Sequence, residues 1–119
     1  MMTDMYVFDL ETGLPVKAES MEEYNAFIEV NRLLDQTELA TCWISTVFLG
    51  LDHRLSDSGP PLVFETMVFP SRRNLSEIDA DRYTTREEAL AGHKRFVEQH
   101  TSELEVLSKA YAKPKKEAR

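Results

Sequence analysis

Strand-like and helical runs of apolar residues alternate along the chain and predict where its secondary structure lies. Met5 to Leu10 is rich in strand-forming side chains. The Gly13 that follows suits a turn with a positive φ, and Val16 begins a short return strand. The sequence therefore opens with a strand, a turn and a second short strand.

Two capping boxes mark the starts of two predicted helices. Ser20 and Glu23 have the spacing of an N-cap and its third helical residue, and apolar side chains then recur at helical spacing from Met21 to Leu34. The polar residues 35–38 are expected to end this helix. Thr85 begins the second box, which predicts a helix from about Arg86 to Tyr111.

The segment from Trp43 to Phe69 predicts a β-hairpin at the centre of a sheet. Its first strand, 41–51, has apolar residues on both faces, which is typical of a central strand, and Trp43 is expected in the core. The second strand, 62–69, follows a loop of ten residues, 52–61, and this short connection predicts antiparallel pairing.

The order of elements predicts an α+β fold. Residues 71–81 are polar and are expected to form a loop, with a short strand at Arg82 and Tyr83. We expect a small, mostly antiparallel sheet with two helices packed on one face, a two-layer sandwich, over a single domain at 1–112. Because two helices cover one face only, a second copy packed on the other face, a homodimer, is compatible with the pattern.

Composition narrows the classes of function. The chain has 119 residues and a net charge of −7, and no apolar run is long enough to cross a membrane. The single cysteine, Cys42, fits a reducing compartment, and we expect a cytoplasmic protein. The acidic body argues against nucleic acid as a partner, although the tail at 113–119 is basic.

Three stretches of the chain resemble a family of small uncharacterised proteins encoded in bacteriophage and prophage genomes. They are WISTVFLGLDH (43–53), GPPLVFETMVF (59–69) and RYTTREEA with GH (82–89 and 92–93). The resemblance implies a phage or prophage setting, in a bacterial host cell. It implies no activity, and no catalytic residue follows from it.

Four residues, Asp52, His53, Glu65 and His93, are the candidates for chemistry. Glu65 interrupts an apolar strand, where a carboxylate without a partner is costly. Two imidazoles and two carboxylates can bind a divalent metal or act as acid and base. The structural alternatives are an ion pair of Glu65 with Arg82 or His93, a hydrogen-bonded core histidine at His93, and an Asp52 side chain that closes a turn.

No recognised catalytic or cofactor motif is present, so we predict no cofactor and no metal site, and a non-enzymatic role is favoured over an enzymatic one. The favoured hypothesis is a binding or accessory module that acts on a host or phage protein or a small ligand. Its ligand-binding candidates are Asp52, His53, Glu65, Arg82 and His93. One alternative is a small metal-dependent hydrolase that uses His53, Glu65 and His93. Another is a nucleic-acid-binding accessory protein that uses the basic tail.

Overall fold

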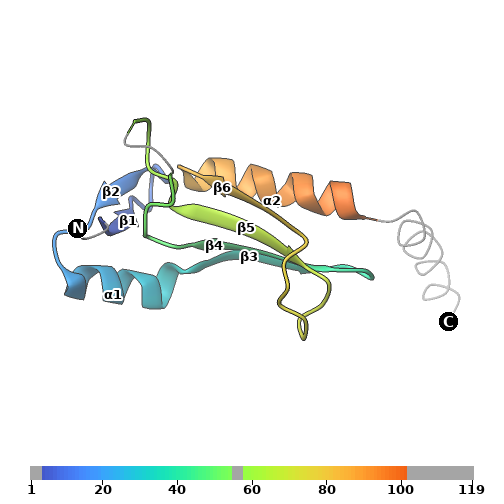
Figure 1. Ribbon diagram of the computed structural model, residues 1–119. Helices are drawn as coiled ribbons and strands as arrows, with labels where there is room; N and C mark the ends of the chain where they lie inside the picture. Colours follow the sequence, from blue (N-terminus) through green and yellow to red (C-terminus); the bar gives the residue numbers. More distant parts are fainter. Residues whose placement is uncertain (1–3, 55–57, 102–119) are drawn as a thin grey trace, which may run out of the picture.

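Two antiparallel sheets and two helices make up the fold in the computed structural model, which describes residues 4–54 and 58–101 (Figure 1). β1 and β2 form a two-stranded sheet, and β3 to β6 form a four-stranded sheet in sequential order. The α+β class predicted from the sequence is confirmed. The elements are β1 (Tyr6–Phe8), β2 (Pro15–Lys17), α1 (Met21–Asn31), β3 (Leu33–Glu38), β4 (Trp43–Phe48), β5 (Phe64–Phe69), β6 (Asp79–Tyr83) and α2 (Arg86–His100).

The predicted hairpin, β4 and β5, lies at the centre of the four-stranded sheet. The two strands are antiparallel, from the pair Trp43–Phe69 at one end to Phe48–Phe64 at the other. Along β4 the side chains alternate between fully buried and half-buried positions. One face of the hairpin therefore belongs to the core, and the other does not.

Helix α2 covers the core face of this sheet. It contacts all four strands, and it begins with the predicted capping box, in which Thr85 and Glu88 each bind the other's backbone N–H. In the second half of the helix, Phe96 packs against the buried Ile44 of β4 and Val68 of β5. The helix ends at His100, and the continuation predicted to Tyr111 lies outside the described residues.

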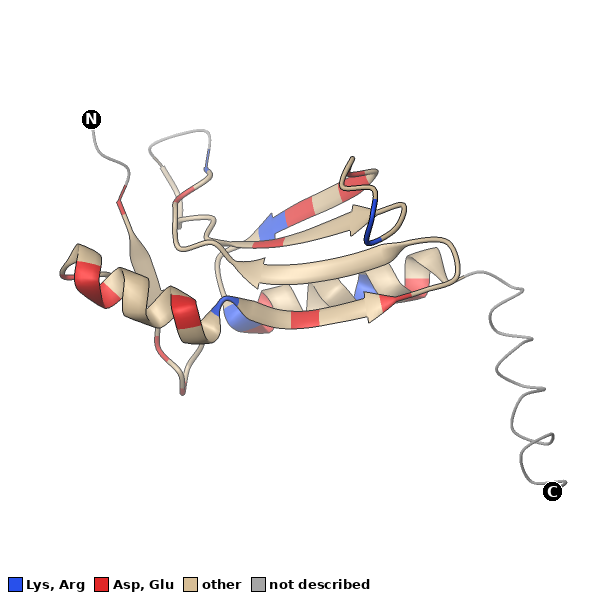
Figure 2. Ribbon diagram, turned by 90° about the horizontal axis from the view of Figure 1, so that it is seen from below, with Lys and Arg blue, Asp and Glu red and all other residues tan. Residues whose placement is uncertain are grey.

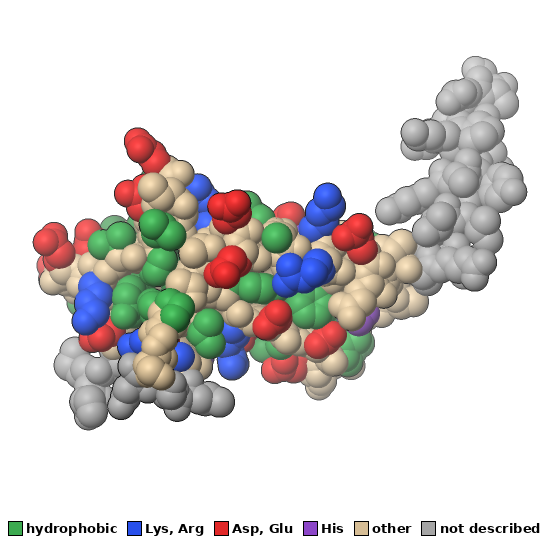
Figure 3. Space-filling view, turned by 90° about the horizontal axis from the view of Figure 1, so that it is seen from above, with side chains coloured by type: hydrophobic (Ala, Val, Ile, Leu, Met, Phe, Trp, Pro, Cys, Tyr) green, Lys and Arg blue, Asp and Glu red, His purple; other side chains and the backbone are tan. Residues whose placement is uncertain are grey.

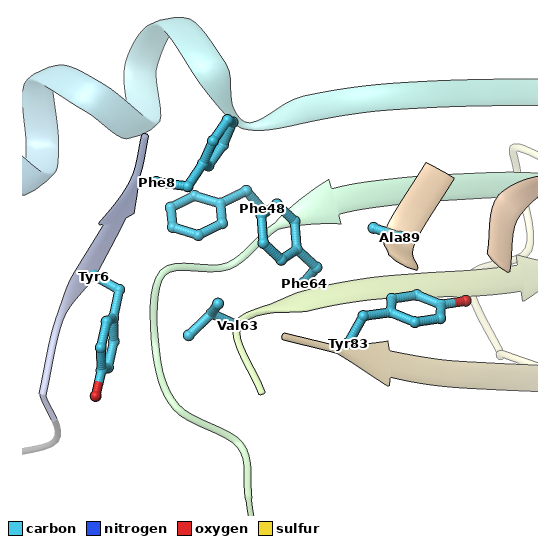
Figure 4. Packing of buried hydrophobic residues seen from close by; sticks show 7 residues of the cluster. All are labelled: Tyr6, Phe8, Phe48, Val63, Phe64, Tyr83 and Ala89. Atoms are coloured by element: carbon cyan, nitrogen blue, oxygen red, sulfur yellow. The ribbon is translucent and has the colours of Figure 1, made fainter. Parts of the chain in front are cut away.

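Helix α1 packs chiefly on β1, at the end of the four-stranded sheet (Figure 1). Its Phe27 meets Phe8 edge-to-face at a centroid distance of 4.9 Å, and Phe8 meets Phe48 at the same distance. Phe48 in turn packs on Phe64, and Figure 4 shows Phe8, Phe48 and Phe64 together between β1 and the central hairpin. Through Phe27 this group of aromatic rings also includes α1. Ser20 caps this helix as predicted, while the Glu23 carboxylate accepts from the N–H of Glu19.

The sequence prediction missed one edge strand, β3, and made the other, β6, too short; the first helix ends at Asn31 and not at Leu34. The polar segment 35–38, expected to end a helix, is part of strand β3, which pairs with β4. Strand β6 begins at Asp79, within the predicted loop. Both strands are polar because each has one neighbour and much of its surface exposed, so they lack the apolar runs that mark a central strand.

In the described part of the chain, neither helix is long and apolar enough to cross a membrane.

Candidate functional site

The face of the sheet opposite α2 is the candidate site. No described helix covers it (Figure 2), and we call it the open face. The opposite side of the molecule mixes charged, polar and apolar side chains (Figure 3). The open face is formed by alternate residues of the two central strands: Trp43, Ser45 and Val47 of β4, and Glu65, Met67 and Phe69 of β5.

A shallow hollow of about 230 Å³ lies in the open face. Its walls are the open-face residues together with Leu49, Leu75 and Arg32. Trp43 and Phe69 lie against each other at a centroid distance of 5.4 Å, and the guanidinium of Arg72 lies 5.1 Å from the centre of the Trp43 ring. The hollow therefore offers an aromatic and aliphatic floor with arginines at its rim.

Glu65 pairs with Arg82 at the β6 side of the hollow. The Nε of Arg82 donates to the Glu65 carboxylate at 2.9 Å. The Glu65 side chain is 8% exposed and that of Arg82 is 43% exposed, so solvent reaches the guanidinium and hardly reaches the carboxylate. Of the partners considered for Glu65 from the sequence, the structure selects Arg82, which compensates a carboxylate that would be costly alone.

His53 lies near the outer side of this ion pair. Its side chain lines a second open hollow of about 410 Å³ together with Arg82, Glu77 and Asp81. Its backbone N–H donates to the carbonyl of Leu62 at 2.9 Å, which ties the loop to the start of β5. Arg82 therefore belongs to the second hollow together with His53, and it pairs with Glu65.

Asp52 closes the loop that it begins. One carboxylate oxygen accepts from the N–H groups of Arg54 and Leu62, at 3.0 and 3.1 Å. The other lies 2.6 Å from the Nε of Arg54. Burial alone would raise the pKa of Asp52, but these hydrogen bonds and the guanidinium lower it below its usual range. This is the turn-closing role considered from the sequence.

His93 is a buried residue of α2, on the other side of the sheet, and it belongs to a chain of hydrogen bonds. Its Nδ1 is 2.7 Å from the hydroxyl of Thr46, which is 2.6 Å from that of Thr66. The hydroxyl of Tyr83 donates to Thr66 at 3.1 Å. The Nε2 of His93 is 2.9 Å from the hydroxyl of Thr37.

One direction of proton donation satisfies every member of this chain. If Tyr83 donates to Thr66, Thr66 can donate to Thr46 and Thr46 to the Nδ1 of His93, which must then be unprotonated. The proton of the imidazole then lies on Nε2, which is also 3.7 Å from the carboxylate of Asp35. Burial lowers the pKa of His93, and Asp35 opposes this shift. His93 is therefore a neutral core histidine with both nitrogens bonded.

Gly92 allows this chain to form. A Cβ at Gly92 would lie 2.1 Å from the hydroxyl oxygen of Tyr83, far inside van der Waals contact. The absence of a side chain at Gly92 therefore makes room for the Tyr83 ring.

The geometry does not support the alternative hydrolase site. Glu65 belongs to the open face, whereas His93 bonds to Thr46 on the core face of the same sheet. Over residues 4–54 and 58–101, no group of three His, Cys, Asp or Glu side chains could hold a metal ion. The basic tail at 113–119, on which the nucleic-acid alternative rests, lies outside the described residues.

Sequence reasoning missed the residues that give the open face its character. Trp43 was expected in the core, but it is half-buried in the hollow together with Met67. Arg32 was not considered, because it was placed inside a predicted helix. The signal was present in β4, whose two faces are both apolar although one layer of helices was predicted.

The fold and the site together define a small α+β domain with one open, partly apolar sheet face. No protein-family model matches the chain, and the comparisons with curated proteins and with solved structures found no match either.

Proposed function

We propose that this chain is a non-enzymatic binding module of the phage or prophage type, which binds a protein of the phage or of its bacterial host through the open face. The sequence resemblance supports the phage setting and the bacterial host, and the single cysteine supports the cytoplasm. The binding surface follows from the open face, and the observation that carries the proposal is its composition.

The centres of protein interfaces are enriched in aromatic residues, methionine and arginine. The open face presents Trp43 against Phe69, with Met67 beside them and Arg72 above the indole ring. Tryptophan and arginine are also the residues that most often contribute large binding energies. A surface of this composition on the centre of a sheet supports recognition of a protein.

A protein partner is favoured over a small ligand by the shape of the hollow. Pockets that enclose small molecules usually have volumes of about 300–1,000 Å³ and bury most of the ligand. The hollow measures about 230 Å³ and is open to solvent, so a free small molecule would stay largely exposed.

The test is capture of partners from host lysate by the tagged chain and by two charge variants. Met67→Glu places a carboxylate in the hollow, and Leu90→Glu makes the same change on α2, where Leu90 is 42% exposed. We expect the same proteins to be captured by the wild type and Leu90→Glu and lost with Met67→Glu. Thermal unfolding of both variants shows whether each still folds.

Capture that survives Met67→Glu would refute the proposal. Light scattering after size exclusion tests the homodimer. If the wild type is a dimer and Met67→Glu is a monomer, a second copy occupies the open face and the proposal of a different partner fails.

A further inference from the structure

The hollow of the open face has room for one large side chain. An engineered apolar cavity of about 150 Å³ holds a benzene molecule, and the hollow measures about 230 Å³. Its floor is apolar, since Val47, Met67 and Phe69 line it. An aromatic or branched side chain from a partner would fill it, whereas the rest of the partner would lie outside.

Arg32 also lines the hollow, and its guanidinium has no carboxylate partner in the part of the chain that the structure describes. Two other arginines at the open face are already paired, Arg72 with Glu38 at 3.3 Å and Arg82 with Glu65 at 2.9 Å. Arg32 lines the hollow beside Leu49, where β4 ends, and no ion pair is formed by it among these residues.

The surroundings of Arg32 hold it at the edge of an apolar surface. It lies close enough to Tyr24 to oppose the upward shift that burial gives to the pKa of that phenol. The hydroxyl of Tyr24 donates to the carbonyl of Leu49 at 2.8 Å, which fixes the ring beside the end of β4. Arg32 is itself exposed, so its guanidinium is accessible to a partner's carboxylate, with which it can form charge-assisted, bidentate hydrogen bonds.

A buried donor without a protein acceptor lies at the other end of β4. The indole N–H of Trp43 is buried and has no acceptor among the described residues. A buried donor without a partner is costly. Since six residues of an antiparallel strand extend about 20 Å, an extended partner segment could reach both ends of β4.

From these observations we infer that the open face recognises a partner segment in which one large apolar side chain enters the hollow and a neighbouring carboxylate pairs with Arg32. The inference rests on the proposed protein-binding function and specifies the chemistry of the partner. The protein itself is acidic, with a net charge of −7, so the attraction is local to Arg32 and does not come from the overall charge.

Trp43 provides the readout, because it is the only tryptophan of the chain and its ring lines the hollow. The probes are three blocked hexapeptides that share a central phenylalanine and differ only in the next residue: glutamate, glutamine or lysine. A fourth peptide keeps the glutamate and replaces phenylalanine by alanine. Each is titrated into the full chain at about 0.15 M salt, where distant charges are largely screened.

We expect the glutamate peptide to change the Trp43 emission saturably and to bind about tenfold more tightly than the glutamine peptide, a difference of about 1.4 kcal/mol. The lysine and alanine peptides should bind more weakly still. In Arg32→Gln the glutamate and glutamine peptides should bind equally. The matched control Arg95→Gln, on α2, should keep the tenfold preference.

Several outcomes would overturn the inference. One is the absence of any saturable change in emission, and another is an equal affinity of the wild type for the glutamate and glutamine peptides. If 3-phenylpropionate binds as tightly as the glutamate peptide, the site takes a free aromatic acid and the protein segment is refuted. A circular dichroism melt of Arg32→Gln shows that it folds.

The lysate experiment separates this inference from the proposed function. If capture is lost with Met67→Glu but unchanged with Arg32→Gln, the open face binds a protein and the inferred carboxylate contact is refuted. If neither variant changes capture, both proposals fail.

Discussion

Neutral His93 should make the stability of the fold depend on pH in a direction opposite to that of a salt-bridged histidine. Burial lowers its pKa below the ordinary value of 6.5, with Asp35 opposing. Below pH 6.5 the unfolded chain binds a proton at this imidazole that the folded chain does not bind. Because stability rises with pH wherever the unfolded state holds more protons, the contribution of His93 is complete above pH 6.5 and is lost as the pH falls.

The hydrogen-bond chain explains why the folded protein resists this proton. A protonated imidazole is a donor at both nitrogens. Thr46 would then have to accept from Nδ1 and turn its own hydroxyl toward Thr66, which already accepts from Tyr83. One buried hydroxyl proton would lose its acceptor, at a cost of about 1–3 kcal/mol.

The size of the effect is given by the change in the free energy of unfolding with pH. Between the folded pKa and pH 6.5 one proton is taken up on unfolding, so the free energy of unfolding should fall by up to about 1.4 kcal/mol for each pH unit. Urea unfolding followed by circular dichroism at half-unit steps from pH 5 to pH 8 measures this. Carboxylates contribute a background slope, mainly below about pH 5.

Two variants isolate the His93 contribution. His93→Gln keeps one acceptor and one donor but does not titrate, and the slope between pH 5 and 6.5 should disappear with it. His100→Gln, on the same helix with a side chain 25% exposed, serves as the matched control and should leave the slope in place. The reasoning is refuted if the wild type and His93→Gln have the same slope.

Substitutions at three further positions test the two sides of the sheet. Gly92→Ala should destabilise the protein by about 1–3 kcal/mol in thermal or urea unfolding, because the clash with Tyr83 outweighs the gain of about 1 kcal/mol in helix propensity. A stabilised variant would contradict the close approach of Tyr83 to Gly92. Thr46→Val should cost about 1–3 kcal/mol because it removes the hydroxyl that bonds to the His93 imidazole, whereas Thr46→Ser, which keeps a hydroxyl, should cost less than half as much. Equal costs would disprove the hydrogen-bond explanation. Arg82→Met should cost about 1–2 kcal/mol at pH 7, since the partly exposed guanidinium compensates buried Glu65; a variant as stable as the wild type in urea unfolding would contradict this role of the ion pair.

The central elements of the fold were predictable, and the edges were not. The hairpin from Trp43 to Phe69 and the capped helix after Thr85 carry apolar patterns that match their periods, so the sequence predicts both. Residues 35–38 are polar, and their place in β3 depends on hydrogen bonds to β4 that no local pattern shows. Tertiary pairing decides an edge strand, whereas burial decides a central one.

The candidate residues lie on opposite faces of the sheet because side chains alternate along each strand. Glu65 and Thr66 are adjacent in β5 and therefore point to opposite faces. Glu65 meets Arg82 on the open face, and Thr66 connects to His93 on the core face. The sequence marked Glu65 and His93 as unusual. His93 is on a helix distant in sequence, so it could be assigned to a face of the sheet only once the position of α2 was known.

This separation assigns different tasks to the two faces of one sheet. On the core face, a polar chain with each nitrogen and hydroxyl partnered holds α2 in one position and offers no described route to a ligand. On the open face, the guanidinium of Arg32 has no carboxylate partner and the indole N–H of Trp43 has no acceptor among the described residues, while an apolar floor lies between them. A guanidinium without a carboxylate partner beside an apolar hollow favours recognition by the open face, because one partner segment can cover the apolar floor and pair with Arg32 in the same contact.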